Sequence, residues 1–554
     1  MQTEKVGEAI LAMYKLKLKS SHFPAQSDIE QNNISIGELL REVARKRPKA
    51  EALVEITQDG NQGRCWTYAE LLSDAERLAN ALITRFTPGE RIVVWSPNNP
   101  EWVLMEYACA LSGLVMVTAN PAFQVRELAY VLKQSGAVGL FQVENFRGNP
   151  MGKIGTDVAA KIEKIREVTN LESDALYAEG PNQLVLPTVS PNDAAMIQYT
   201  SGTTGFPKGA VLSHLGLVNN ARYYAHRCGT TPETTWANIM PMFHTSGCGM
   251  ITLGCLQAGC RMLLFSFFDP DKVLDQLEIY SANIILGVPT MVIALVDKQE
   301  ALPRDLSALK LVNCGGSTVA PELVRRVRSI MGTGFSTVYG QTENCPVITL
   351  HHINDNIDDI SNTAGQPVSQ TEVSIRSVDD NQTVELGVVG EICTRGPCVM
   401  LGYNDNPKAT SETVDAKGWL HTGDLGQMDA RGYVTVTGRV KEMIIRGGEN
   451  HFPKEIENCL LEHPDVIEVA VVGLPDEKWG EVIGAFIRSK RPIDKAVLHA
   501  HCRANISPQK TPNVWVRVDH FPLTGSGKIQ KFKLKEDYIT GTVSYTHLRA
   551  HETP

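Results

Sequence analysis

The residues best suited to chemistry lie in one short stretch, Gln198 to Ala210. Between two apolar runs it holds these hydroxyl, glycine and lysine residues: Thr200, Ser201, Gly202, Thr203, Thr204, Gly205, Lys208 and Gly209. Small residues let a backbone close around an anion with N–H and O–H donors pointing inward, and a lysine adds positive charge. A flexible turn is the simpler interpretation of a Gly/Ser/Thr run, but this order of residues favours a phosphate-binding loop. It is not the Walker A pattern, because glycine follows Lys208.

Two glycine-containing stretches follow predicted strands further along the chain. Gly315, Gly316 and Ser317 come after the strand at Leu311-Val312. In α/β folds ligands bind at the carboxyl ends of parallel strands, although a plain turn is an equal alternative here. The second stretch is Tyr339-Gly340-Gln341-Thr342-Glu343. An aromatic face can stack on a base, a hydroxyl can donate to a phosphate, and a carboxylate can hold Mg²⁺.

Three charged residues in the last third of the chain are also candidates. Asp424 lies between Gly423 and Gly426 and could accept hydrogen bonds from a ligand, although aspartate is also common in turns. Arg439 follows it after a short predicted strand. Lys528 lies on a Gly/Ser loop, where an ordinary solvated lysine is the alternative to a catalytic cation.

The elements that must position these residues alternate between strand and helix. Helical spacing is found over 35–47, 68–85 and 101–112, and short apolar strands over 52–56, 91–95 and 114–118. A helix over 125–135, a strand over 138–142 and a helix over 215–226 continue the alternation. This rhythm predicts an α/β fold with parallel sheets.

The alternation of strands and helices ends at about residue 371. The closely spaced short strands that follow predict an antiparallel barrel or small sheet. Residues 440–538 then have the size of a separate small domain. We expect an N-terminal extension over 1–34 with a surface helix within 1–23, a large domain over 35–439, and a disordered or extraneous tail over 539–554.

Composition excludes several functions. A net charge of −9 over 554 residues gives no basic field for nucleic acid. No apolar run approaches the roughly 18 residues of a membrane span, and the N-terminus lacks the order of a signal peptide. The twelve cysteines form no Cys-x-x-Cys pair, which favours reduced, mostly buried thiols in a cytoplasmic protein.

Five motifs in order give the chain a specific resemblance. They begin at Tyr199 (Tyr-Thr-Ser-Gly-Thr-Thr-Gly-Phe-Pro-Lys-Gly), Tyr339 (Tyr-Gly-Gln-Thr-Glu), Gly418 (Gly-Trp-Leu-His-Thr-Gly-Asp), Gly438 (Gly-Arg-Val-Lys-Glu-Met-Ile) and Pro522 (Pro-Leu-Thr-Gly-Ser-Gly-Lys-Ile). From about residue 35 to 538 the chain resembles the AMP-binding, adenylate-forming superfamily, in its acyl-CoA synthetase branch. The resemblance implies a large domain of two α/β sheets and a small barrel, followed by a mobile α+β C-terminal domain.

The resemblance also implies an enzyme that joins a small carboxylic acid to coenzyme A with ATP and Mg²⁺, through an acyl-adenylate. Thr200 to Lys208 would hold the β- and γ-phosphates. Tyr339, with Gly315 to Ser317, would line the adenine pocket, Thr342 would contact the α-phosphate, and Glu343 would bind Mg²⁺. Asp424 would accept from the ribose hydroxyls, with Arg439 beside them.

In the family the small domain serves two half-reactions in turn. Lys528 matches the adenylation lysine, whose ammonium stabilises charge at the α-phosphorus. The hinge falls on Lys441, and rotation brings Gly447, Gly448 and Glu449 to the pantetheine channel. The resemblance also admits a homodimer.

The sequence defines the identity of the carboxylic acid substrate less closely than it defines the nucleotide site. His244 matches an aromatic position between the acyl pocket and the thiol tunnel, and Thr245, Ser246, Gly247 and Cys248 form a small, uncharged wall beside it. No aspartate within 243–250 could pair with a substrate ammonium, which argues against an amino acid. A medium- or long-chain fatty acid is our expectation. An aromatic acid, transfer to a carrier protein, light-emitting oxidation and a silent nucleotide-binding protein are the alternatives.

Overall fold

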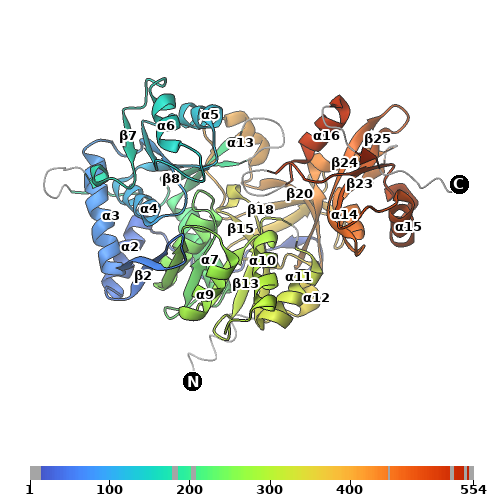
Figure 1. The fold of residues 1–554 in the computed structure, drawn as a ribbon, viewed down its shortest axis with the longest axis horizontal. Coiled ribbons are helices and arrows are strands. Elements are labelled where there is room, and N and C mark those ends of the chain that lie inside the picture. The colour runs from blue at the N-terminus through green and yellow to red at the C-terminus, as the bar shows by residue number, and fades with distance from the viewer. Residues whose placement is uncertain are drawn as a thin grey trace. The chain divides into compact units, whose positions relative to one another are not determined.

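A computed structural model describes residues 14–177, 185–200, 207–317, 319–446, 449–523, 529–541 and 546–547. These residues form two compact units (Figure 1). The first contains the described residues up to Ser374 together with Cys393–His421 and Met428–Thr435. The second contains Ile375–Ile392, Thr422–Gln427 and the described residues from Val436 onward.

A seven-stranded sheet in the first unit carries the hydroxyl-rich stretch. Its strand order is β19-β9-β8-β5-β4-β6-β7, parallel from β8 to β7 and antiparallel at β8/β9 and β9/β19. The strands are β4 (Arg91–Trp95), β5 (Val115–Ala119), β6 (Gly139–Gln142), β7 (Glu167–Asn170), β8 (Ala194–Thr200), β9 (Lys208–Ser213) and β19 (Gly402–Tyr403).

A nine-stranded sheet in the same unit carries the two glycine-containing stretches. Its order is β16-β15-β14-β13-β12-β10-β11-β2-β3, with a parallel run from β14 to β2. The strands are β2 (Glu51–Ile56), β3 (Gln62–Thr67), β10 (Thr235–Asn238), β11 (Arg261–Phe265), β12 (Ile284–Gly287), β13 (Leu311–Gly315), β14 (Gly334–Gly340), β15 (Val347–Leu350) and β16 (Gln366–Pro367). The two parallel sheets confirm the expected α/β fold.

Helices of the first unit pack on these sheets. They are α2 (Ile36–Lys46), α3 (Tyr68–Ile83), α4 (Pro100–Ser112), α5 (Val125–Ser135), α6 (Met151–Ala159), α7 (His214–Arg227), α8 (Leu253–Ala258), α9 (Pro270–Ile279), α10 (Pro289–Ala301), α11 (Pro321–Arg326), α12 (Ile357–Asn362) and α13 (Pro407–Thr413). Helix α4 is buried along its whole length, since its apolar residues surround the helix. It begins at Pro100, where Asn99 accepts from the Trp102 N–H, and ends at Gly113 with φ of +70°.

The expected small antiparallel sheet contains five strands, in the order β1-β17-β18-β20-β21. They are β1 (His22–Phe23), β17 (Glu372–Arg376), β18 (Gly390–Arg395), β20 (Leu420–Met428) and β21 (Val434–Arg439). Strand β1 pairs with β17 at His22↔Ser374 and Phe23↔Val373. The described part of the expected N-terminal helix, from Tyr14 to Phe23, is not helical and ends in β1, where Phe23 is fully buried against this sheet.

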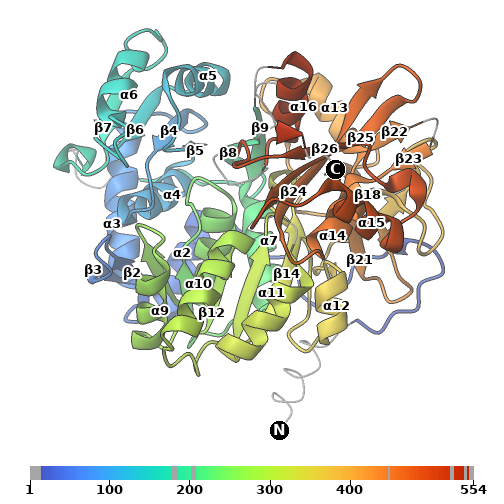
Figure 2. The same ribbon diagram turned by 45° about the vertical axis from the view of Figure 1, so that its right-hand side comes forward.

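The second unit ends in a small α/β domain (Figure 2). A long hairpin of β24 and β25 forms its centre, and β26 lies parallel to β25. Its elements are the turn η5 (Val440–Glu442), β22 (Ile444–Arg446), β23 (Glu449–His451), α14 (Pro453–Leu461), β24 (Val466–Asp476), β25 (Gly480–Ser489), α15 (Lys495–Asn505), β26 (Val514–Arg517), α16 (Lys531–Thr540) and β27 (Thr546–His547).

The tail over 539–554, which we expected to be disordered or extraneous, contains regular secondary structure in its described part. Helix α16 continues to Thr540 because Leu534 is buried in a core shared with Phe486 and Val516. Thr546 and His547 form β27, which pairs antiparallel with β26. The remaining residues of 539–554, apart from Gly541, lie outside the described part of the chain.

Candidate active site

The β8–β9 hairpin brings the two ends of the predicted phosphate loop together. Thr200 pairs with Lys208 across the hairpin, and the Thr200 hydroxyl donates to the Lys208 carbonyl at 3.4 Å. The Pro207 carbonyl accepts a hydrogen bond of 2.8 Å from the Tyr130 hydroxyl. The predicted loop residues Ser201, Gly202, Thr203, Thr204 and Gly205 lie outside the described residues. Thr200 and Lys208, the first hydroxyl residue and the lysine of the predicted loop, are thus cross-strand neighbours in the β8–β9 hairpin.

The two glycine-containing stretches lie at the carboxyl ends of adjacent parallel strands. Gly315 at the end of β13 pairs with Val338 of β14, directly before Tyr339. A Cβ at Gly315 would lie 2.6 Å from the Val338 carbonyl oxygen, and one at Gly340 would lie 2.0 Å from the Pro346 carbonyl oxygen. Only glycine permits these backbone approaches. Gly316 and Ser317 follow as exposed residues on the same edge of the sheet.

Glu343 is held in a short 3₁₀ turn, Thr342–Asn344, directly after β14. The Gln341 N–H donates to the Pro346 carbonyl at 2.9 Å, and the Met400 N–H donates to the Glu343 carbonyl at 2.8 Å. Thr342 and Glu343 are only 9% and 8% exposed. The carboxylate is thus positioned by backbone contacts on both sides of the turn.

Tyr403 connects Glu343 to Lys208, and the sequence motifs did not identify it. Its hydroxyl donates to Glu343 Oε1 at 2.7 Å, and Lys208 Nζ lies 4.7 Å from the centre of its ring. Burial raises the pKa of Tyr403, and the charge of Glu343 raises it further, so the hydroxyl keeps its proton. The arrangement holds one ammonium and one carboxylate on the two sides of a neutral phenol.

Asp424 and Arg439 form an ion pair within the second unit, with Arg439 Nε 3.0 Å from Asp424 Oδ1. Asp424 is 7% exposed, and its N–H donates to the Thr422 hydroxyl at 3.0 Å. Lys441 and Glu449 belong to the same unit and are exposed. Three further predicted residues of this region, Gly447, Gly448 and Lys528, lie outside the described residues.

His244 is fixed by Ser246 at the start of a buried π-helix, Ser246–Thr252. The Ser246 N–H donates to His244 Nδ1 at 3.2 Å, and the Ser246 hydroxyl lies 3.0 Å from the same nitrogen. Since Nδ1 accepts, the ring proton is on Nε2. π-Helical turns are frequent at functional sites.

The predicted acyl wall beside His244 is buried. Gln198 Nε2 lies 3.1 Å from the Cys248 sulfur, which joins the wall to the strand of the phosphate loop. A Cβ at Gly247 would lie 2.4 Å from the Pro241 carbonyl oxygen. Backbone packing alone therefore requires a glycine at position 247, whether or not a ligand lies beside it.

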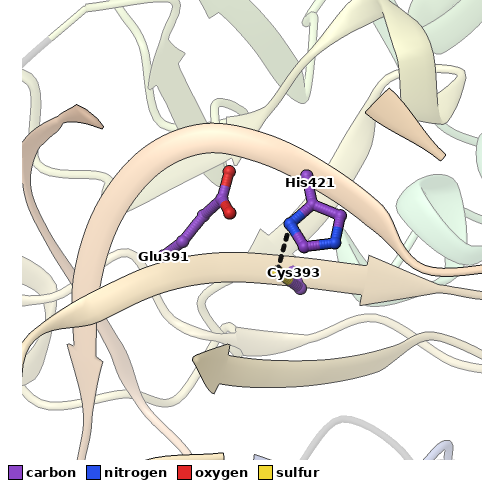
Figure 3. Close-up of side chains that lie close together, drawn as sticks. All are labelled: Glu391, Cys393 and His421. Carbon is purple, nitrogen blue, oxygen red and sulfur yellow. Dashed lines mark hydrogen bonds between the residues drawn. The ribbon is translucent and has the colours of Figure 1, made fainter. Parts of the chain in front are cut away.

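A cysteine and a histidine from the five-stranded sheet also lie together (Figure 3). Cys393 Sγ is 3.4 Å from His421 Nδ1, and His421 Nε2 is 3.9 Å from an Asp415 oxygen. Glu391, two residues before Cys393 on β18, accepts from the Gly423 N–H at 2.9 Å. These contacts stabilise the sheet, and we assign no metal to them.

Two family profiles cover most of the chain. The profile described as AMP-binding enzyme matches residues 40–404, and that of the AMP-binding enzyme C-terminal domain matches residues 455–528. Among the described residues no helix is both apolar enough and long enough to cross a bilayer.

Curated relatives match over nearly their full length. The putative acyl-CoA synthetase YngI of Bacillus subtilis is 35% identical, covering 91% of this chain and 97% of that protein. The mitochondrial medium-chain acyl-CoA ligase ACSF2 of Homo sapiens is also 35% identical, covering 91% of this chain and 88% of that protein.

Solved structures share the fold at lower identity. ATP-bound MatB from Rhodopseudomonas palustris has a TM-score of 0.83 at 27% identity, covering 91% of this chain and 99% of that one. O-succinylbenzoate CoA synthetase MenE from Bacillus subtilis, in complex with ATP and magnesium ion, has a TM-score of 0.80 at 27% identity. The match covers 90% of this chain and 99% of that one. With both family profiles and its curated relatives in agreement, the chain belongs to the AMP-binding enzymes, in their acyl-CoA synthetase branch.

Proposed function

We propose that the protein is an ATP-dependent, AMP-forming acid:CoA ligase that activates a medium- or long-chain fatty acid. The observation that carries this proposal is the cluster of Lys208, Tyr403 and Glu343 beside the β8–β9 hairpin. An ammonium and a carboxylate at fixed separation suit a triphosphate and its divalent cation, because one neutralises phosphate oxygens and the other ligates the cation.

The donor set at Glu343 fits Mg²⁺. The cation prefers carboxylate oxygen with several retained waters, and the one hydrogen bond from Tyr403 uses a single carboxylate oxygen. Glu343 would hold Mg²⁺, which when bound neutralises charge on the phosphates. Thr200, the loop that follows it and Lys208 would hold the β- and γ-phosphates.

The remaining nucleotide contacts are assigned by position. Tyr339 would pack on adenine, with Gly315 to Ser317 lining the same pocket, Gly340 and Gln341 completing the turn, and Thr342 contacting the α-phosphate. Asp424 would accept from both ribose hydroxyls, and its ion pair with Arg439 orients the carboxylate.

Two half-reactions follow in sequence. The carboxylate of the acid attacks the α-phosphorus, pyrophosphate leaves, and an acyl-adenylate forms. Lys528 would stabilise the charge that develops at phosphorus. Rotation at Lys441 would then replace Lys528 with Gly447, Gly448 and Glu449, and the thiol of coenzyme A would displace AMP.

The acyl group would lie beside His244 against the buried wall that includes Cys248. Since this wall carries no charge, it suits an alkyl chain, and the medium-chain name of one relative supports the same choice. A second candidate is an aromatic acid, because MenE acts on O-succinylbenzoate and shares the fold. Transfer to a carrier protein is a third.

The experiment that tests the function is a panel of acids with the purified protein. Aliphatic acids from short to long and aromatic acids are each assayed for pyrophosphate release, with and without coenzyme A. We expect release that peaks with medium or long aliphatic acids, and AMP release that needs coenzyme A. A peak with aromatic acids would favour the second candidate, and AMP release independent of coenzyme A would contradict the ligase.

We also propose a cytoplasmic location. None of the twelve cysteines, all of which are described, forms a disulfide, and only Cys65 is exposed. Reduced thiols fit a reducing compartment. Fractionation of cells that express the full chain would test this location, and recovery with mitochondria, as in the name of the human relative, would overturn it.

A further inference from the structure

Lys531 lies between two carboxylates of the second unit. Its ammonium is 2.8 Å from Glu442 Oε2 and 2.7 Å from Glu457 Oε1. Glu442 belongs to the turn Val440–Glu442, which we call the hinge turn because it contains Lys441. Glu457 lies on α14 and also accepts from the Val471 N–H of β24 at 2.9 Å. One ammonium therefore joins the first residue of α16 to the hinge turn, and through Glu457 to the core of the small domain.

A second contact on the same face of α16 reaches the strand after the hinge turn. Lys535, one helical turn after Lys531, places its ammonium 2.9 Å from Glu481 Oε1. The other oxygen of Glu481 accepts from the Ile445 N–H at 3.1 Å. The helix is thus attached to the chain on both sides of Met443, and it cannot shift along that segment without breaking two ion pairs.

The segment that precedes α16 is closed at both ends by hydrogen bonds. Leu523 and Ile529 form a β-bridge, and the Gln530 N–H donates to the Pro522 carbonyl at 2.8 Å. Gln530 Nε2 also donates to the Leu523 carbonyl at 3.2 Å. Lys528 itself lies outside the described residues, but Ile529, which follows it, is held by the bridge to Leu523, and Lys531 follows Lys528 by three positions.

A simple stabilising ion pair is the alternative explanation of Lys531. Lys510 and Glu455 form such a pair in the same domain, 2.5 Å apart and partly exposed, and among the described residues neither has an ion pair with the hinge turn. Lys531 differs in two respects. Its side chain is only 20% exposed, and its partner Glu442 is adjacent to Lys441. This partly buried pair therefore connects the start of α16 to the hinge turn, two parts that the proposed mechanism requires to move together.

We propose that Lys531 is a positioning residue for adenylate formation, which holds the start of α16, three residues after Lys528, in fixed register with the hinge turn. The inference rests on the proposed function. Any rotation at Lys441 would then carry the start of α16, to which the chain from Lys528 leads directly, together with the hinge turn. Loss of the contact would let the start of α16 move relative to the hinge turn, and an error of about 1 Å in a catalytic group can cost about a hundredfold in rate.

The test compares the two half-reactions in full-length Lys531→Met, Lys531→Arg, Glu442→Gln and Lys510→Met. Pyrophosphate release from acid and ATP without coenzyme A reports adenylation, and thioester formation from supplied acyl-adenylate reports the second half. We expect Lys531→Met to lower kcat of adenylation by about 10- to 100-fold. The KM for ATP and the second half-reaction should change by less than about twofold, as expected for a group that acts only on orientation. Lys510→Met should leave both half-reactions unchanged.

The variants are expected to fold because a second ammonium, that of Lys454, lies near Glu457 and Glu442 and offsets part of their charge. If Lys531→Met still fails to fold, Lys531→Arg and Glu442→Gln provide the same comparison. Lys531→Arg should recover part of the adenylation rate. In a Lys528→Ala background, Lys531→Met should cause no further loss, because it acts through Lys528.

Two results would overturn the positioning role. One is an equal loss in both half-reactions, which indicates a general loss of structure. The other is an unchanged adenylation rate in every folded variant that breaks the contact. Failure of the proposed function is distinguishable from both, because the unmodified protein would then release no pyrophosphate with any acid of the panel.

Discussion

Tyr403 donates a hydrogen bond of 2.7 Å to Glu343 from a position 60 residues further along the chain. The same ring lies 4.7 Å from the Lys208 ammonium, so one phenol separates the proposed phosphate lysine from the proposed metal carboxylate. A salt bridge between the two would neutralise both groups before a ligand arrives. The neutral phenol keeps the two groups near each other without pairing them, so each can still bind a ligand.

Replacing Tyr403 with phenylalanine should therefore raise the Mg²⁺ concentration needed for adenylation. A hydrogen bond to a charged group contributes about 1.5–3 kcal/mol, so we expect a loss of about ten- to a hundredfold in kcat/KM at limiting Mg²⁺. Magnesium titrations of pyrophosphate release measure this. Tyr433→Phe is the matched control, because the Tyr433 hydroxyl donates to a buried Asp355 oxygen at the same 2.7 Å, away from Glu343. An equal change in the control would contradict the role of Tyr403.

Asp424→Ala should weaken binding of ATP. Two ribose hydroxyls would lose their charged acceptor, and the ion pair between Asp424 and Arg439 would be lost, so we expect affinity to fall by about ten- to a hundredfold. Calorimetric titration with ATP measures the change. Asp359→Ala removes a comparable aspartate, paired with both terminal nitrogens of Arg431 at 2.7 and 2.9 Å, and should leave ATP binding unchanged. Unchanged affinity in Asp424→Ala would remove that residue from the ribose site.

Much of this arrangement could be predicted from the sequence because it is local. The strands, the helices and the glycines that end β13 and β14 follow from periodicity and turn chemistry over a few residues. Tyr403 could not be predicted in this way, because its place depends on the pairing of Tyr403 with Ala210, which only the folded sheet determines. The helix expected within 1–23 is wrong in its described part for a related reason. Lysines and a short apolar patch suggested a helix, whereas the described residues of this segment end in β1, where Phe23 is buried against β17.

Lys528→Ala should nearly abolish adenylate formation, leaving a small residual rate, and should spare thioester formation from a supplied acyl-adenylate. A positioned cation that acts only on the developing charge contributes about 100- to 1,000-fold, and the second half-reaction does not use it. Pyrophosphate release and thioester formation are measured separately. Lys533→Ala, which removes an exposed lysine on α16, should affect neither step. Similar losses in both half-reactions would count against the rotation at Lys441.

Glu106 is a carboxylate buried in the middle of α4. It is 2% exposed, and neither of its carboxylate oxygens has a hydrogen bond within the described part of the chain. Glu101 on the same helix is also buried but pairs with Arg64, with one contact of 3.0 Å. Burial raises the pKa of Glu106 well above its ordinary value, so the folded protein keeps this group protonated.

The pH dependence of stability follows from the raised pKa of Glu106. A carboxyl group whose pKa is raised by folding contributes its full stability below the unfolded pKa of about 4.3, and this is lost as pH rises toward the folded pKa. If the pKa is higher by one in the folded state, the free energy of unfolding is about 1.4 kcal/mol lower at a pH above the folded pKa than at low pH. Glu106→Gln, which removes the ionisation and nearly keeps the shape, should therefore raise the melting temperature at pH 8, and the gain should shrink as pH falls toward 5. Glu101→Gln, which breaks the pair with Arg64, should lower it at pH 8. Thermal unfolding across this range measures both, and a gain for Glu106→Gln that stays constant with pH would show that packing, and not ionisation, sets the cost.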